Sequence, residues 1–135
     1  MQSNYTLERI TDLEELAVAL TEHYKPEQTL EQSREILSSK FIFGYKCCVK
    51  DAVGFCYILK SDGFYIVDAC NEGVKMFRAL STVKTVIKEA FDTYTDRVIC
   101  GYKVGDVESK IIRRRLGFKK FTTIGDLDLF SLEKE

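Results

Sequence analysis

Three strand-like segments joined by very short connections constrain this chain more than any other feature of its sequence. The segments 41–49, 53–59 and 64–70 are rich in aromatic and β-branched residues, which is typical of strands. Residues 50–51 (Lys-Asp) fit a tight turn, and residues 61–63 (Ser-Asp-Gly) are a strong turn signal. Connections of two or three residues cannot support a parallel crossover, so we predict an antiparallel meander.

A long helical pattern follows the meander and leads into a further strand. From about residue 73 to residue 94, apolar side chains recur at the spacing of one helix face: Val74, Phe77, Leu80, Val83, Ile87 and Phe91. The segment 97–102 then has the composition of a strand. A strand, a helix and a strand in this order form a parallel crossover, so we predict that 64–70 and 97–102 are parallel neighbours.

Two helices are predicted between a short strand at 5–10 and the meander. Thr11, with Glu14 three residues later, matches a capping box at the start of the first helix. Its predicted inward-facing stripe consists of Leu13, Leu16, Ala17 and Leu20. Pro26 interrupts the pattern, and Thr29 can cap the second helix.

The end of the chain is predicted to form a helix and a hairpin. Residues 107–116 have a helical pattern, and Gly117 suits the left-handed position that ends many helices. Residues 118–124 and 127–132 then pair around the turn at 125–126.

The complete order is therefore β-α-α-β-β-β-α-β-α-β-β, which combines a meander with one parallel crossover. We predict an α+β fold: a mixed, strongly twisted sheet of about seven strands with helices on both faces, in α/β/α layers. At 135 residues the chain has the length of one domain, spanning residues 1–135.

Composition narrows the classes of function. The five cysteines form no CxxC pair, and the one histidine, His23, is remote from them in sequence, so we expect no zinc or other metal site. Buried reduced thiols fit a cytoplasmic protein. The first twelve residues have neither the basic lead nor the apolar core of a signal peptide. No apolar run approaches the ~20 residues of a membrane span, so we expect no membrane association.

The net charge of −1 hides an uneven distribution. Residues 1–39 carry eight acidic and three basic side chains, whereas residues 101–121 carry seven basic and two acidic ones. Arg113, Arg114 and Arg115 are consecutive, and because consecutive helical residues lie ~100° apart they cannot all point at one ligand. This basic zone is either a contact for phosphate or an acidic protein, or a solvated face near a helix C-terminus.

Two stretches, together with the order of elements over nearly the whole chain, resemble the GNAT family of N-acetyltransferases. "KDAVGFCYIL" looks like the family's hairpin between its second and third strands. "DVESKIIRRRLGF" looks like its late helix, with Asp106 where the family has an asparagine, Ser109 at a small position, and the Leu-Gly-Phe ending at 116–118. The resemblance implies a GNAT-like fold and acetyl-CoA as the acyl donor.

A narrower likeness is to small GNAT-like proteins of tailed phages, including an internal virion protein. It rests on the layout of about the last 60 residues: a long basic helix, a strand, Val-Gly, a helix, and a Leu-Phe strand near the end. This likeness implies a protein partner and a location in the host cytoplasm or the virion.

The chain departs from the family where coenzyme A would bind. The family holds the pyrophosphate on backbone N–H groups of a glycine-rich loop at the start of the long helix. In the matching stretch, "ACNEGVKMFRAL", Gly73 is the only glycine and Glu72 brings a negative charge. Lys75 and Arg78 would compensate in part, as point charges. The candidate donor contacts are therefore Gly73, Lys75, Arg78, Asp106 and Arg113, and we expect acetyl-CoA binding to be weak or absent.

The catalytic groups are also incomplete. In the family, a tyrosine on this helix often serves as the general acid that protonates the leaving thiolate. The matching position here is Arg113, whose guanidinium stays protonated and cannot act as an acid. Tyr102, at the end of its strand, is the substitute candidate acid. Asp68 is the candidate base, since a carboxylate in an apolar strand has a raised pKa. The alternative is that Asp68 is a structural residue at a bulge or strand end, where its side chain forms hydrogen bonds with the backbone.

Three functions follow from these patterns. The first is a GNAT-fold binding module with little or no transferase activity, and the second is an active N-acetyltransferase with an atypical donor site. The third, a nucleic-acid binder, lacks an aromatic-rich basic motif and is opposed by the acidic remainder of the chain.

Overall fold

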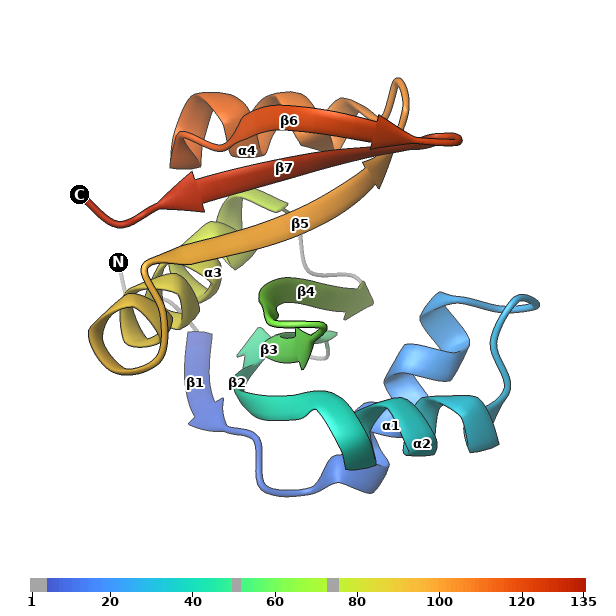
Figure 1. Ribbon diagram of the computed structural model, residues 1–135. Helices are drawn as coiled ribbons and strands as arrows, with labels where there is room; N and C mark the ends of the chain where they lie inside the picture. The colour runs from blue at the N-terminus through green and yellow to red at the C-terminus, as the bar shows by residue number, and fades with distance from the viewer. Residues whose placement is uncertain (1–4, 50–51, 73–75) are drawn as a thin grey trace.

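The computed structural model describes residues 5–49, 52–72 and 76–135 and shows one mixed sheet with four helices (Figure 1). The elements are β1 (Tyr5–Arg9), α1 (Leu13–His23), α2 (Leu30–Lys40), β2 (Phe41–Val49), β3 (Ala52–Ser61), β4 (Phe64–Glu72), α3 (Met76–Thr93), β5 (Arg97–Lys103), α4 (Val107–Leu116), β6 (Lys119–Ile124) and β7 (Leu127–Glu133). The seven strands lie in the order β1-β2-β3-β4-β5-β7-β6. The predicted fold class and element order are confirmed.

The meander and the crossover both form as predicted. Strands β2, β3 and β4 pair antiparallel in sequence order, and β4 and β5 pair parallel. The turn between β3 and β4 has positive φ at both Asp62 (52°) and Gly63 (83°), as a two-residue type I′ turn requires. The predicted turn at residues 50–51 lies outside the described residues.

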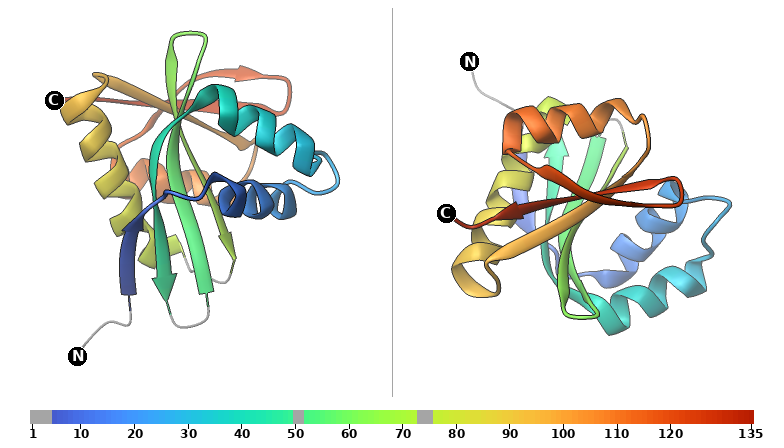
Figure 2. Two further views of the ribbon diagram at one scale, coloured as in Figure 1. Left: turned by 90° about the horizontal axis from the view of Figure 1, so that it is seen from below. Right: turned by 45° about the horizontal axis from the view of Figure 1, so that its top comes forward.

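The helices divide between the two faces of the sheet (Figure 2). Helices α1 and α2 pack on one face, where the buried cluster includes Leu16, Leu20, Leu37, Phe55, Tyr57, Leu59 and Cys70. Helices α3 and α4 pack on the other, around Phe43, Ile58, Val86, Ile87, Val98, Ile112 and Phe130. Alternating residues of β3 and β4 therefore serve two separate cores, which explains why these strands are apolar throughout.

The helix ends follow local rules, with one correction to the sequence-based prediction. Asp12, not Thr11, caps α1: its Oδ1 accepts hydrogen bonds from the N–H groups of Glu14 and Glu15. Leu13, predicted to face inward, lies in the first turn and is 38% exposed. The predicted caps at Thr29 and Gly117 are confirmed; Gly117 has φ of 85°.

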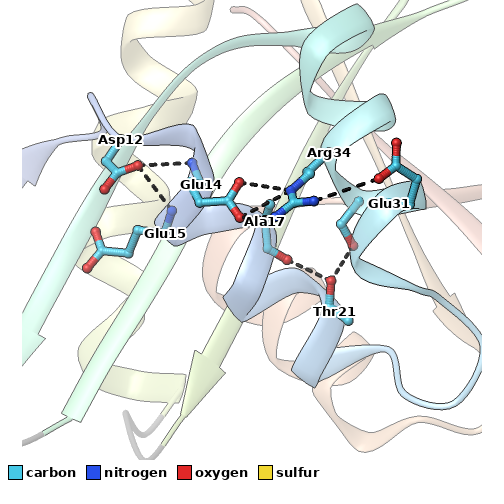
Figure 3. Close-up of polar contacts among 8 residues, drawn as sticks. Asp12, Glu14, Glu15, Ala17, Thr21, Glu31 and Arg34 are labelled. Carbon is cyan, nitrogen blue, oxygen red and sulfur yellow. Dashed lines mark hydrogen bonds and ion pairs between the residues drawn. The ribbon is translucent and has the colours of Figure 1, made fainter.

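Polar contacts join α1 to α2 (Figure 3). Arg34 donates to both carboxylate oxygens of Glu14, at 2.7 Å in the shortest contact. Beneath them, the Thr21 hydroxyl donates to the carbonyl of Ala17 and lies 2.7 Å from the Ser33 hydroxyl. Because Ser33 is fully buried, this second contact satisfies a polar group inside the interface. The two helices therefore form one unit on their face of the sheet.

Candidate functional site

Strands β4 and β5 part soon after they meet. They pair at Ile66 and Ile99. By contrast, the β3–β4 ladder continues to Glu72 and the β5–β7 ladder to Lys103. In Figure 1, β5 runs with β7 and β6 in the upper part of the view while β4 stays with β3 below. The sheet is thus divided along this line, and the facing edges of the two strands carry main-chain groups that the ladder does not use.

The hairpin register determines which main-chain groups of β4 face this parting. A two-residue turn makes its flanking residues a hydrogen-bonded pair, and such pairs then recur at every second position. Tyr57 and Asp68 are therefore such a pair, and the N–H of Ala69 points away from β3, toward β5. That N–H donates a 2.9 Å hydrogen bond to Oδ1 of Asp68. The carboxylate of Asp68 thus occupies a main-chain donor at the parting.

Two tyrosines hold the same carboxylate from the α1/α2 face. The Tyr57 hydroxyl donates to Oδ2 of Asp68 at 3.0 Å, and the Tyr24 hydroxyl donates to Oδ1 at 3.3 Å. Tyr57 is fully buried in β3, and Tyr24 follows the last turn of α1. Asp68 therefore receives hydrogen bonds from two side chains and one main-chain group.

Burial and hydrogen bonding act on Asp68 in opposite directions. Desolvation raises the pKa of its carboxyl group above the ordinary value, while the hydrogen bonds from Tyr57, Ala69 and Tyr24 lower it; burial is the larger effect. Burial and the nearby Asp68 charge raise the pKa of both tyrosine hydroxyls. Both tyrosines therefore remain protonated donors across the physiological range.

The two predicted catalytic side chains lie on opposite faces of the sheet. Asp68 shares its face with Tyr57 and the α1/α2 cluster, whereas Tyr102 packs with the α3/α4 cluster. The Tyr102 ring meets that of Phe130 edge-on at 6.2 Å. Burial, followed by the charges around it, raises the pKa of the Tyr102 hydroxyl. Tyr102 is thus a protonated group on β5, and Asp68 a carboxylate on the other side of the parting.

Two of the predicted acyl-donor contacts, Asp106 and Arg113, lie at the start of α4 and in its last turn, and each has a local contact. Asp106 is the N-cap of α4 and accepts a 2.9 Å hydrogen bond from the N–H of Glu108. Arg113 is exposed, with its guanidinium carbon 6.0 Å from the ring centre of Phe130, the ring that Tyr102 also contacts. The structure thus brings Tyr102 and Arg113 to one aromatic ring.

The remaining donor candidates cannot be placed. Gly73 and Lys75 lie outside the described residues. Arg78 belongs to the first turn of α3, but its side chain is outside the described part of the structure. Their roles remain predictions from the sequence.

Sequence reasoning missed the two tyrosines that hold Asp68. Tyr57 had a usable signal, because a two-residue turn at Asp62-Gly63, inside the turn predicted at 61–63, places residue 57 opposite residue 68. Tyr24 had none, since its contact depends on how the end of α1 lies over the sheet.

Two classes of site are not found in residues 5–49, 52–72 and 76–135. No group of three or more His, Cys, Asp and Glu side chains in this part of the chain is arranged to hold a metal ion. No helix described there is both long and apolar enough to cross a membrane. No disulfide joins the five cysteines, all of which lie in the described part of the chain, and Cys47, Cys56, Cys70 and Cys100 are buried.

Comparison with solved structures identifies the fold. The chain superposes on a GNAT-family protein of Desulfovibrio desulfuricans with a TM-score of 0.70 and 13% identity, covering 96% of this chain and 98% of that one. The ribosomal-protein-S18-alanine N-acetyltransferase of Escherichia coli gives 0.68 and 9%, covering 94% and 90%. An aminoglycoside acetyltransferase in complex with coenzyme A gives 0.63 and 13%, covering 96% and 94%.

These likenesses extend over nearly the full length of the chain but lie at low sequence identity. They show that the protein has the GNAT acetyltransferase fold. No protein-family model matches the sequence, and no curated protein matches it.

Proposed function

We propose that the protein is a GNAT-fold binding module that takes up coenzyme A thioesters weakly or not at all and has little or no acetyltransferase activity. The observation that carries this proposal is the state of Asp68. Its carboxylate accepts hydrogen bonds from two tyrosine hydroxyls and from the Ala69 N–H. A carboxylate held in this way is satisfied as a structural group.

The parted strands fit an extended acyl donor only in part. The amide groups of a pantetheine chain would pair with free main-chain groups on the facing edge of β4. Beyond the last pair at Ile66 and Ile99, the Ala69 N–H is the first such donor after Val67, and Asp68 already occupies it. The approach to α3 also carries Glu72 and a single glycine, Gly73, which disfavours a pyrophosphate at that helix start.

A calorimetric titration of the protein with acetyl-CoA tests the proposal. We expect no saturation below about 1 mM acetyl-CoA, which corresponds to less than about 4 kcal/mol of binding free energy. Micromolar binding would overturn the binding-module function. A thiol-release assay with a panel of amines and N-terminal peptides completes the test, because slow turnover does not need tight binding.

The raised pKa of Asp68 favours a second candidate, an active N-acetyltransferase. In that reaction the amine nitrogen attacks the thioester carbonyl and passes one proton to the Asp68 carboxylate. The C–S bond breaks, and the leaving thiolate takes a proton from the Tyr102 hydroxyl, so that proton exchange with solvent restores both groups. Such an enzyme would release free coenzyme A in the presence of an amine. An Asp68→Asn variant would then lose turnover while keeping donor binding, because an amide cannot accept that proton.

A binding module acts through a partner. The narrower likeness to small phage proteins favours a protein partner from a virion or a host cell over a nucleic acid. We therefore propose that this chain binds a protein partner and that the divided sheet has a structural role in it.

A further inference from the structure

A hollow of about 330 Å³ opens between α3, the end of α4 and the end of β7. Its floor is apolar and consists of Ile87, Phe91, Leu116 and Leu132. Ile87 is 5% exposed, and the other three are partly buried. A volume of this size accommodates one large side chain or a small ligand. The floor therefore offers an apolar contact to a group from outside.

The rim of the hollow is cationic. Among the described residues, the hollow is lined by Lys84, Lys88, Arg115 and Lys134, against one carboxylate, Asp92. The chain as a whole has 20 basic and 21 acidic side chains, so this ratio of four to one is a local concentration of positive charge.

Two of these cations are already engaged, and two are not. Lys88 forms a 2.8 Å ion pair with Asp92, and Lys134 donates a 3.0 Å hydrogen bond to the carbonyl of Phe91. Among the described residues, no carboxylate lies within ion-pair distance of Lys84 or Arg115. Both are exposed. An incoming carboxylate would therefore meet two cations without first breaking an existing pair.

The hollow lies away from the parted strands. Its α3 residues come from the middle and C-terminal part of that helix, and its α4 residues, Arg115 and Leu116, are the last two of theirs. The parting instead lies toward the C-terminal ends of β4 and β5, from which both helices begin. Occupation of the hollow therefore does not require Asp68, Tyr102 or an acyl donor.

We propose that this hollow is a docking site for an acidic protein segment that inserts one large apolar side chain. The apolar floor takes the inserted side chain, and Lys84 and Arg115 pair with carboxylates on either side of it. The hollow would define the partner of the proposed binding module as a protein with an exposed acidic segment. In that respect the inference rests on the proposed function. In this proposal Arg115 contacts an acidic protein, which is one of the two interpretations that the sequence left open for the basic zone.

The test uses the full-length protein and an acidic hexapeptide with leucine and phenylalanine between two pairs of glutamates. Titration into ¹⁵N-labelled protein should give saturable shifts that map to α3, the end of α4 and the end of β7, with Kd below about 1 mM. The same peptide with glycines in place of leucine and phenylalanine should bind at least about tenfold more weakly. A peptide with lysines in place of the glutamates should not bind.

Paired charge reversals give a matched control. The double variant Lys84→Glu/Arg115→Glu should weaken binding of the acidic peptide by at least about tenfold. The double variant Lys110→Glu/Arg114→Glu changes the net charge equally on exposed positions of α4 outside the hollow, and it should bind as the natural protein does. Equal weakening by both pairs would overturn the site, because the peptide would then respond only to overall charge.

Two further outcomes would also overturn it: no saturation by the acidic peptide, or shifts that gather away from the hollow. Either result leaves the proposed function standing if acetyl-CoA also fails to bind and no amine is acetylated. If acetyl-CoA binds tightly and the peptide binds as expected, the binding-module function fails while the docking site survives.

Discussion

The Tyr57 hydroxyl donates a 3.0 Å hydrogen bond to Oδ2 of Asp68, its neighbour across the β3–β4 ladder. Tyr57 is fully buried, so the aromatic ring fixes the position of the donor. This contact anchors the one carboxylate that the sequence singles out as a base. The strength of this hydrogen bond decides between two roles for Asp68, a structural carboxylate and a catalytic base.

A Tyr57→Phe substitution should destabilise the protein by about 1–3 kcal/mol, because it leaves a desolvated carboxylate without one of its donors. The ring volume is unchanged, so packing is preserved. Urea unfolding followed by circular dichroism measures the change. Tyr65→Phe on β4 is the matched control, since its hydroxyl is not part of the Asp68 cluster, and should cost less than about 0.5 kcal/mol. Equal losses in the two variants would contradict a specific role for the Tyr57–Asp68 bond.

Asp68 should also make stability depend on pH in an unusual direction for an aspartate. Burial raises its folded-state pKa above the ordinary aspartate value of about 3.9. The folded protein therefore binds this proton more strongly than the unfolded chain does. Its contribution to stability is full below the unfolded pKa and is lost as the pH rises through the folded pKa.

The difference in unfolding free energy between the natural protein and Asp68→Asn isolates this effect, because asparagine does not titrate. As the pH falls from 7 toward 4, the natural protein should gain stability relative to the variant. Chemical denaturation at each pH measures the difference, and the other carboxylates cancel between the two proteins. A difference that stays constant would mean that hydrogen bonding balances desolvation at this carboxyl group, and a difference that changes in the opposite direction would mean that hydrogen bonding outweighs it.

The order of strands and helices was predictable because it depends on local signals. The turn at Asp62-Gly63 sets the β3–β4 register, and the length of the following helix forces a parallel crossover. The exact start of α1 was harder to predict, because Thr11 and Asp12 are adjacent and both residue types cap helices; in the structure Asp12 has the extended backbone of the cap position and its side chain accepts the two hydrogen bonds.

The candidate site was predictable only in part. Asp68 stands out because it interrupts an apolar strand, but both faces of β4 are covered by helices, so alternation does not reveal which face it occupies. The separation of Asp68 from Tyr102 across the sheet therefore required the structure. So did the hollow, whose lining joins α3, α4 and β7 from distant parts of the chain.

Gly44 provides a test of how tightly the centre of the sheet is packed behind Tyr57. A Cβ atom at Gly44 would lie 2.5 Å from Cβ of Tyr57 and 2.7 Å from the carbonyl oxygen of Cys56. The second of these is main chain and cannot move without breaking the β2–β3 ladder. We expect Gly44→Ala to destabilise the fold by about 3 kcal/mol or more.

Gly101→Ala is the control for Gly44→Ala. Its added Cβ would meet only side-chain atoms of Leu127 and Leu129, at 3.2 Å or more. Those side chains can rotate, so the cost should stay below about 1 kcal/mol. Thermal unfolding of both variants measures the contrast. If Gly44→Ala unfolds at the temperature of the natural protein, the β2–β3 contact is looser than these distances indicate.

Glu72 is the last residue of β4, four positions before α3 begins at Met76, and its charge tests why this chain would reject coenzyme A. A carboxylate near the pyrophosphate position repels the ligand, and at an effective dielectric constant of ~20 this costs a few kcal/mol at close range. Glu72→Gln removes the charge and should strengthen acetyl-CoA binding by about tenfold or more. Glu72→Gly also removes the bulk, so a further gain would assign part of the block to side-chain size. Glu133→Gln at the end of β7 makes the same change of net charge and should have no effect, as calorimetric titration of all three variants would show. If both Glu72 variants bind acetyl-CoA no better than the natural protein does, the obstacle lies at the occupied Ala69 N–H, and the parted strands themselves exclude the donor.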